Sequence, residues 1–355
     1  RCALWEDADV ILSPLPDLPA VSYIMPVLNE EEFLEAAVRT ILAQDYVGEK
    51  EIVLALGPSK DLSNTIAARL ATEDPRVRLV DNPARDIPAG LNVAIAASRH
   101  PVVVRVDAHS ELTPDYTRHG VEVLRRESAA NVGGIMRAAG TSAVQRAIAR
   151  CYNSPFGLGG GAYHGDGVAG PAESAYLGIF RREALDAVGG YDPGILRGED
   201  WELNLRIRRA GGAIWFEPHL QVTYWPRASF GDLAKQFFAT GTWRAVLVRR
   251  YGRANPVRFF APGVLVLSLG VSVLTLVLLS THVVPWASWW LLLLAPLAAY
   301  IAGVGFATVR IPEQHGLRDR ALTAASLITM HLSWGSGFLR GITLGGGRVV
   351  DRSRM

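Results

Sequence analysis

Two side chains with metal-ligating groups follow directly after an apolar stretch in the middle of the chain. Residues 102–106 read Val-Val-Val-Arg-Val, and Asp107 and His109 come next. An apolar run of this kind predicts a buried strand, and ligands bind to α/β sheets at the carboxyl ends of their strands. Side chains two residues apart lie on the same side of an extended chain. Asp107 and His109 could therefore hold one divalent cation, and that cation could hold a diphosphate.

A second acidic pair, Glu199 and Asp200, begins a predicted helix at residues 199–210. A helix start favours ionised carboxylates because of the helix dipole. Taken alone, such a pair is also typical of ordinary helix-start charge, just as a lone histidine at a strand end is often a surface residue. Asp107 and His109 can act together with Glu199 and Asp200 only if the fold places the two pairs side by side.

The elements that must position these residues alternate between strand and helix in the first 110 residues. Strands are expected at 21–25, 51–56, 77–80 and 102–106, with helices at 33–42, 63–70 and 89–98. Asn29 and Glu32 have the spacing of a capping box for the first helix. This order predicts a parallel sheet with crossover helices. No Gly-x-Gly-x-x-Gly follows the first strand, which disfavours a dinucleotide-dependent dehydrogenase.

After Asp107 the pattern is less regular. Helices are expected at 114–126 and 182–188, and short strands at 132–136, 175–180, 213–216 and 221–225. Residues 153–171 are rich in glycine and predict a long loop. Loops of this length are usually functional or mobile, so this one could be a lid over a site or a linker.

The C-terminal third is typical of a membrane region. No charged residue occurs between Phe259 and Val309, and the segments 259–280 and 286–308 are each long enough to cross a hydrocarbon core of ~30 Å. A third apolar segment, 321–339, is interrupted by a histidine and two glycines and could span or lie on the surface. Residues 230–251 predict an amphipathic helix at the interface.

The charge distribution predicts an orientation. The net charge is +2, but the chain from Pro226 onward has fourteen Lys and Arg against four Asp and Glu, so this part carries +10 and the rest −8. By the positive-inside rule the N-terminal part faces the cytoplasm, in a multi-pass protein of the cell (inner) membrane whose arginines meet membrane lipids. Nucleic acid is not an expected partner. Two cysteines exclude a disulfide framework.

Four features together resemble the family 2 glycosyltransferases with the GT-A fold, in particular the membrane-anchored, succinoglycan-type ExoA group. Pro26-Val-Leu-Asn-Glu30 follows the first strand, Asp107-x-His109 replaces the usual Asp-x-Asp, Gly198-Glu-Asp200 opens a helix, and an apolar region ends the chain. The resemblance covers roughly residues 20–345. It implies an α/β, Rossmann-like and mostly parallel GT-A catalytic domain at 20–228, between an N-terminal arm (1–19) and an interface helix (229–258), a transmembrane region (259–345) and a basic tail (346–355).

The resemblance also implies roles. Asp107 and His109 would bind a divalent cation that neutralises the leaving diphosphate, and the nitrogen ligand favours Mn²⁺ over Mg²⁺. Asp200 would be the general base of an inverting transfer to a hydroxyl. The donor would be a nucleoside-diphosphate sugar, with a UDP-sugar favoured, bound by Pro26, Asn29, Glu30, Gly57, Ser59, Asp61, Arg85, Asn92 and Asp107. Acceptor-binding residues would be Glu199, Trp201, Gln236, Trp243 and Arg244.

Two departures from the family pattern leave questions open. Ala55-Leu-Gly-Pro58 replaces the usual paired aspartates, so the nucleotide base is not fixed, and Gln236 to Arg244 only loosely resembles Gln-x-x-Arg-Trp. Several of the expected donor- or acceptor-binding residues could have a structural role only. Glu30 could cap a helix, Asn92 could hydrogen-bond to the backbone, and Trp243 and Arg244 could anchor the protein at the membrane interface. The expected acceptor is a polyprenyl-diphosphate-linked saccharide in polysaccharide or envelope-glycan synthesis. Alternatives are a polyprenyl-phosphate glycosyltransferase and a non-catalytic membrane protein with a degenerate nucleotide-binding domain.

Overall fold

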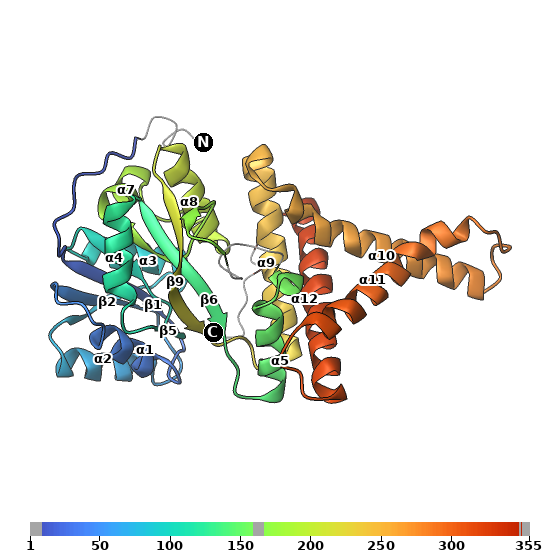
Figure 1. Ribbon diagram of the computed structural model, residues 1–355, viewed down its shortest axis with the longest axis horizontal. Helices are drawn as coiled ribbons and strands as arrows, with labels where there is room; N and C mark the ends of the chain where they lie inside the picture. The colour runs from blue at the N-terminus through green and yellow to red at the C-terminus, as the bar shows by residue number, and fades with distance from the viewer. Residues whose placement is uncertain (1–8, 159–166, 348, 350–355) are drawn as a thin grey trace. The chain divides into compact units, whose positions relative to one another are not determined.

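The computed structural model describes residues 9–158, 167–347 and 349, and these divide into two compact units. The first unit contains the chain up to Arg137 and the segment that ends at Trp225. The second contains the residues from Ala138 to the glycine-rich loop and those from Pro226 onward. Figure 1 shows the sheet of the first unit and the helices of the second. Each unit is described by itself below.

The first half of the sheet is parallel, as the strand and helix pattern predicts. Its strands run in the order β3-β2-β1-β4, and Val21 in β1 is level with Lys50 in β2 and Val102 in β4. The chain passes outward from β1 to β3 and then returns to β4 on the other side of β1, which makes a topological switch point between β1 and β4. The elements of this half are β1 (Val21–Val27), α1 (Leu34–Leu42), β2 (Lys50–Leu56), α2 (Ser63–Glu73), β3 (Val77–Asp81), α3 (Ile87–Ala97) and β4 (Val102–Arg105).

The second half is antiparallel, and within the described residues the complete sheet has nine strands. Strand β4 pairs with β8, and the order continues through β6, β9 and β5, with β7 on β9. The expected α/β domain followed by C-terminal helices is confirmed, but the sheet is mixed rather than mostly parallel, because the strands after β4 pair antiparallel. The elements are β5 (Ser110–Leu112), α4 (Tyr116–Arg126), β6 (Asn131–Ala138), β7 (Gly170–Pro171), β8 (Tyr176–Arg181), α7 (Arg182–Val188), α8 (Glu199–Arg209) and β9 (Ile214–Tyr224).

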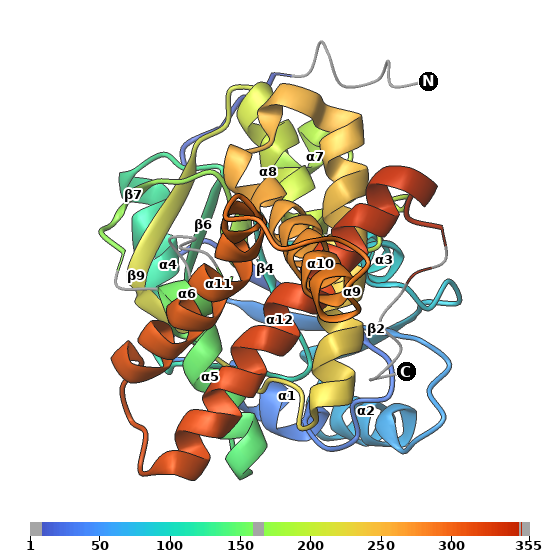
Figure 2. The same ribbon diagram turned by 90° about the vertical axis from the view of Figure 1, so that its right-hand side faces the viewer.

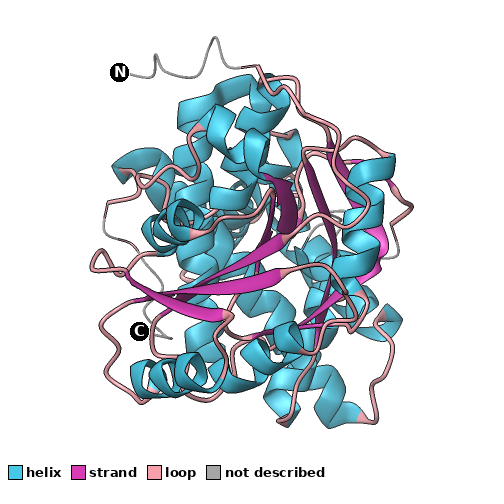
Figure 3. Ribbon diagram, turned by 90° about the vertical axis from the view of Figure 1, so that its left-hand side faces the viewer, coloured by secondary structure: helices cyan, strands magenta, loops and turns pink. Residues whose placement is uncertain are grey.

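Helices cover both faces of this sheet (Figure 3). Alternate residues of β1 face opposite sides, because Tyr23 and Met25 join one apolar layer and Ile24 joins the other. The layer with Tyr23 receives the apolar faces of α1, α2 and α4, and the layer with Ile24 those of α3, α7 and α8. Burial on both faces explains why β1, β2 and β4 read as continuous apolar runs rather than alternating ones.

Two local predictions are wrong. Helix α1 starts at Leu34 and has no side-chain cap, so Asn29 and Glu32 do not form a capping box. Asn29 instead adopts a left-handed conformation with φ 53°, and its side chain accepts a hydrogen bond from the Lys60 N–H at 2.7 Å. The two strands expected at 213–216 and 221–225 are one strand, β9, in which polar side chains interrupt the apolar pattern without ending the strand.

The second unit is helical (Figure 2). Helix α12 is continuous through residues 321–339, so its glycines are not breaks as expected. A Cβ at Gly337 would collide with the Phe238 carbonyl oxygen and one at Gly341 with that of Thr242, so these glycines allow close packing of α12 on α9. The helices are α5 (Ala143–Tyr152), α6 (Pro155–Leu158), α9 (Phe230–Tyr251), α10 (Ala261–Ser280), α11 (Trp290–Arg310) and α12 (Leu317–Leu344).

Two segments of the second unit, Val257–Ser280 and Trp290–Arg310, are long and apolar enough to cross a membrane. In the most apolar stretch of each segment, only 22% and 11% respectively is buried within the protein, so most of the side chains there face outward. Soluble core helices of the same length would be covered, so this exposure favours membrane association. Helix α12 is not among the helices that are long and apolar enough to cross a membrane.

Candidate active site

The polar segment predicted to follow the fourth strand lies at the carboxyl end of β4, beside the switch point. Val106 continues the strand, since its N–H donates to the Ile24 carbonyl at 3.0 Å. The chain then turns, and the Ser110 N–H donates to the Asp107 carbonyl at 2.9 Å. The expected extended geometry of residues 107–109 is therefore wrong, and Asp107 and His109 have different partners. Both side chains remain partly exposed, at 16% and 17%, so a ligand can reach them.

Arg105, the last residue of β4, connects Asp107 with the acidic pair at the start of α8. Its guanidinium donates to Asp107 Oδ1 at 3.2 Å, to Glu199 Oε1 at 3.2 Å and to Asp200 Oδ1. The side chain is 3% exposed and lies 5.7 Å from the centre of the Tyr191 ring. Asp107 and Asp200, 93 positions apart in the sequence, thus share one buried cation. This role was not predicted, although an arginine inside an apolar strand signals a buried partner.

Helix α8 begins at the acidic pair because Gly198 adopts a left-handed conformation, with φ 77°, which glycine allows at low cost. Burial raises the pKa of the Asp200 carboxyl above its ordinary value; Arg105 opposes this, whereas Glu199 and Asp107 add to it. Desolvation thus outweighs the helix start, which was expected to favour the ionised form. A carboxylate whose pKa is raised toward neutrality is suited to accept a proton during catalysis.

His109 is oriented by a residue from the first strand's loop. Its Nδ1 lies 3.0 Å from Glu30 Oε1, and its ring packs edge-on against Tyr224 with centroids 5.7 Å apart. The Glu30 backbone N–H in turn donates to Ser63 Oγ at 2.7 Å. A carboxylate on one ring nitrogen fixes the imidazole and leaves the other nitrogen for a metal, which is a common arrangement at metal sites.

The expected donor-binding loop after β2 is tied to the loop after β1. Ser59 Oγ accepts from the Asn29 N–H at 3.1 Å, and the Gly57 N–H donates to the Val27 carbonyl at 2.8 Å. Asp61 accepts hydrogen bonds from the Glu31 N–H and the Ser63 N–H, at 3.1 and 3.0 Å. These contacts bring the loops of β1 and β2 together at the carboxyl edge, where a nucleotide would bind.

The remaining expected donor residues occupy different places. Pro26 is in β1, and Arg85, with φ 63°, lies in the turn before α3. Asn92 holds the Tyr191 backbone: its amide donates to the Tyr191 carbonyl and its oxygen accepts the Tyr191 N–H, both at 2.8 Å. Because Tyr191 faces Arg105, Asn92 supports the wall of the site.

The expected acceptor residues fall in both units. Glu199 contacts Arg105, and Trp201 is 6% exposed in α8. Gln236, Trp243 and Arg244 lie on α9 in the second unit. Gln236 Oε1 accepts from the Tyr152 hydroxyl at 3.1 Å, and Trp243 Nε1 donates to the Val349 carbonyl at 2.7 Å. The Arg244 guanidinium lies 4.0 Å from the Phe259 ring centre. The predicted lid at 153–171 lies partly outside the described residues.

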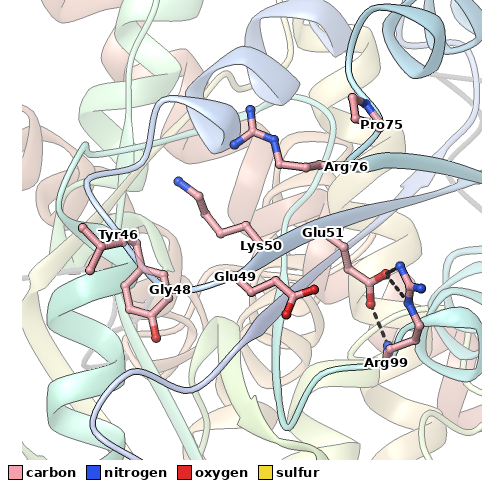
Figure 4. A pocket seen from close by; sticks show the side chains of 9 residues that line it. Tyr46, Gly48, Glu49, Lys50, Glu51, Pro75, Arg76 and Arg99 are labelled. Carbon is pink, nitrogen blue, oxygen red and sulfur yellow. Dashed lines mark hydrogen bonds and ion pairs between the residues drawn. The ribbon is translucent and has the colours of Figure 1, made fainter.

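An open pocket of about 530 Å³ lies in the first unit at the opposite edge of the sheet (Figure 4). It is lined by residues that precede or begin strands, including Lys50, Glu51, Arg76 and Arg99. Its charged groups are largely paired with one another or with nearby carbonyls: Glu51 binds Arg99, and Lys50 Nζ donates to the Gln44 carbonyl at 2.9 Å. Because ligands of such sheets bind at the carboxyl edge, this pocket is not the expected donor site.

Glu51 in that pocket stabilises the amino edge of the sheet in a pH-dependent way. Burial alone would raise the pKa of its carboxyl, but hydrogen bonds from Ser22, Arg99 and Arg78 lower it from 4.5 to about 2. The stabilisation is therefore present above pH 4.5 and is lost as the pH falls toward 2. Glu51→Gln should lower the unfolding free energy by about 3 kcal/mol at pH 7. Thermal melts in detergent should show this difference shrinking between pH 4.5 and 2.

The matched control is Glu49→Gln. Glu49 lines the same pocket but is 74% exposed, so its replacement should change the melting temperature little at any pH. Equal effects of the two substitutions would contradict a specific role for the buried Glu51 carboxylate.

Comparisons with known proteins agree with this geometry. The family model of glycosyl transferase family 2 matches residues 22–189. The succinoglycan biosynthesis protein ExoA of Rhizobium meliloti (strain 1021) is 33% identical over 319 residues, which cover 89% of this chain and 93% of that protein. A dolichyl N-acetyl-alpha-D-glucosaminyl phosphate 3-beta-D-2,3-diacetamido-2,3-dideoxy-beta-D-glucuronosyltransferase of Methanococcus voltae is 22% identical over 263 residues, 71% of this chain and 80% of that protein.

A solved structure shares the fold. The mannosyltransferase PcManGT from Pyrobaculum calidifontis, in complex with GDP-Man and Mn²⁺, superimposes with a TM-score of 0.56 at 18% identity and covers 95% of this chain and 91% of its own. The extent of the match to the Rhizobium protein, together with the family match across β1 to α7, decides the assignment. The chain belongs to the family 2 glycosyltransferases.

Proposed function

We propose that this glycosyltransferase moves a sugar, with inversion, from a nucleoside-diphosphate donor to a hydroxyl of a polyprenyl-diphosphate-linked saccharide. The observation that carries the proposal is the Arg105 cluster, in which Asp107 and Asp200 meet at the carboxyl edge of the sheet. A group that can bind the donor's cation and a group that can deprotonate the acceptor must be neighbours in such a reaction. Arg105 keeps both carboxylates beside each other.

Asp107 and His109 would supply the ligands of a divalent cation. Asp107 offers a carboxylate oxygen and His109 an imidazole nitrogen, with Glu30 on the other nitrogen of the ring. This mixed donor set favours Mn²⁺ over Mg²⁺, which prefers oxygen ligands and retains water. When bound, the cation supplies positive charge that stabilises the departing diphosphate. The similar fold of a mannosyltransferase solved with GDP-Man and Mn²⁺ supports a divalent cation at the donor site.

Asp200 would act on the acceptor. Its raised pKa suits it to take the proton of the attacking hydroxyl, and Arg105 holds the carboxylate in place. Glu199 and Trp201, in the same turn of α8, would orient the acceptor sugar. A processive, polymer-extruding role is disfavoured because the Gln-x-x-Arg-Trp motif is imperfect.

The relatives and the apolar helices support a lipid-linked acceptor. The Rhizobium protein is named for succinoglycan biosynthesis and the Methanococcus protein for a dolichyl-linked sugar phosphate. Val257–Ser280 and Trp290–Arg310 would anchor the protein in the inner membrane, with the catalytic domain on the cytoplasmic side where arginines flank the spans. The substrate would then be a growing polysaccharide or envelope-glycan precursor.

A thermal-shift panel on the full-length chain in detergent tests the donor. UDP-, GDP- and dTDP-sugars are compared with and without Mn²⁺, and we expect a UDP-sugar to stabilise the protein only when the metal is present. The free nucleoside without diphosphate is the control and should have no metal-dependent effect. If no nucleotide sugar stabilises the chain with either Mn²⁺ or Mg²⁺, the non-catalytic alternative is favoured.

A further inference from the structure

A second cluster of metal-ligating side chains lies in the first unit where α4 packs against β9. It consists of His119 from α4 and Glu217 and His219 from β9. One ligand atom of each residue lies within 4.8 Å of the others, and in the described residues this is the group of three that meets that distance. The proposed donor site does not use any of these residues.

Glu217 and His219 lie two residues apart in β9, next to an irregularity of the strand. Trp215 packs against the same apolar layer as Leu220 and Val222, although its position along the strand has the opposite parity. The strand must therefore gain one residue between 215 and 220, as in a β-bulge, and bulges redirect side chains. At this point the His219 N–H donates to Glu217 Oε1 at 3.2 Å, and His219 Nδ1 lies 2.7 Å from the same oxygen.

His119 completes the cluster from the helix. Its Nε2 is buried, makes no hydrogen bond, and lies 3.7 Å from Glu217 Oε1. Its Nδ1 faces Glu122 Oε2, one helical turn further on, at 3.8 Å. The two imidazole rings are in edge-to-face contact with centroids 5.5 Å apart. A buried ring nitrogen without a partner is costly in free energy unless a ligand occupies the space in front of it.

We propose that His119, Glu217 and His219 bind a zinc-class divalent cation. Two imidazoles and one carboxylate are a ligand set that suits Zn²⁺, with water in the fourth position. Metal–ligand distances of about 2.0–2.1 Å place tetrahedral ligand atoms about 3.4 Å apart. The separations of 2.7 and 3.7 Å are close to this value, so small rotations of the exposed His219 and the His119 ring complete the geometry.

The surroundings support a bound ion. Glu122 is placed to orient the His119 ring from its other nitrogen, as outer carboxylates do at histidine metal sites. Glu217 is 5% exposed in its side chain, whereas His219 is 79% exposed, so the carboxylate forms the floor of the site and an ion can enter from solvent. The ion would tie α4 to β9 and stabilise the half of the sheet that follows the donor site.

This ion would be separate from the donor's cation. Glu217 precedes Tyr224 by seven residues in β9, a distance of about 20 Å along a strand, and it is Tyr224 that packs against His109. Loss of one site should therefore leave the other intact.

Cobalt titration of the untagged full-length chain tests the proposal. The chain is stripped of metal and carries Asp107→Asn, so that the proposed donor site contributes little. We expect one equivalent of Co²⁺ to give the intense visible absorption of a tetrahedral site, and Zn²⁺ to displace it. His219→Ala should weaken the affinity at least about tenfold.

The matched control is His282→Ala, which removes an exposed histidine far from this cluster in the sequence and should leave the titration unchanged. Because His219 is exposed, its replacement should preserve the metal-free melting temperature, so a weaker affinity reports the site rather than misfolding. If Co²⁺ gives no tetrahedral absorption, or if His219→Ala binds as tightly as its parent, the proposal is wrong. In that case the Glu217 carboxylate is held by its contacts with the two histidines alone.

Discussion

Replacing Asp200 with asparagine should lower the rate of sugar transfer to a hydroxyl acceptor by about 10²- to 10⁴-fold, the range that a general base contributes. Asparagine has the same shape but cannot take the proton. Arg105 keeps its contacts with Asp107 and Glu199, so the buried guanidinium is still compensated and the protein should fold. Initial rates at saturating donor measure the loss, and metal-dependent stabilisation by the donor should remain near that of the unmodified protein.

The pH profile adds a second measurement to the same prediction. Burial raises the pKa of Asp200 from its ordinary value of 3.8. A base must be ionised, so activity should fall as the pH decreases through this raised pKa, well above pH 3.8. The residual activity of Asp200→Asn should not show this step.

Glu199→Gln is the matched control because Glu199 is the adjacent carboxylate and contacts the same arginine. It should change KM for the acceptor more than kcat, since the proposed base is still present. Near-normal turnover of Asp200→Asn would instead favour the alternative acceptor, polyprenyl phosphate. A phosphate oxygen is already ionised and needs no base.

The parallel half of the fold could be predicted because each element carries a local signal. Apolar runs predict the ends of β1, β2 and β3 to within two residues of the observed ends. The antiparallel half depends on contacts between distant segments: β9 is continuous through Glu217-Pro218-His219, although those residues break the apolar pattern. The glycines of α12 predict an interruption that the helix does not have, because they serve packing on α9, which the sequence of one helix cannot show.

The acidic residues of the site could be predicted from the sequence, but the contacts that join them could not. Asp107 and Asp200 stand at a strand end and a helix start, which sequence patterns mark. Their connection through Arg105, and the pairing of His109 with Glu30 across 79 positions, depend on which strands are neighbours. The charge of Arg105 within an apolar strand was the available signal for the first of these contacts.

Asp107→Asn should lower the transfer rate by about 10²-fold or more, because a cation held less firmly stabilises the leaving diphosphate less. The substitution keeps the shape of the side chain, and Arg105 retains Glu199 and Asp200. The melting temperature without ligands should therefore change little, whereas the Mn²⁺ concentration needed for donor stabilisation should rise at least about tenfold. Glu30→Gln is the milder companion: it disturbs only the orientation of His109, for which a loss of about 10- to 100-fold is typical.

The titration with Mn²⁺ separates two sources of positive charge near the diphosphate. Arg105, which donates to Asp107, is the other cation at this place. If a bound cation carries the charge, chelation by EDTA abolishes transfer by the unmodified protein, and Asp107→Asn shifts the metal requirement. If the chelated protein keeps its rate, or Asp107→Asn has an unchanged Mn²⁺ requirement, the cation is not held at Asp107. Arg105 would then be the group that stabilises the leaving diphosphate, and Asp107 would serve to orient it.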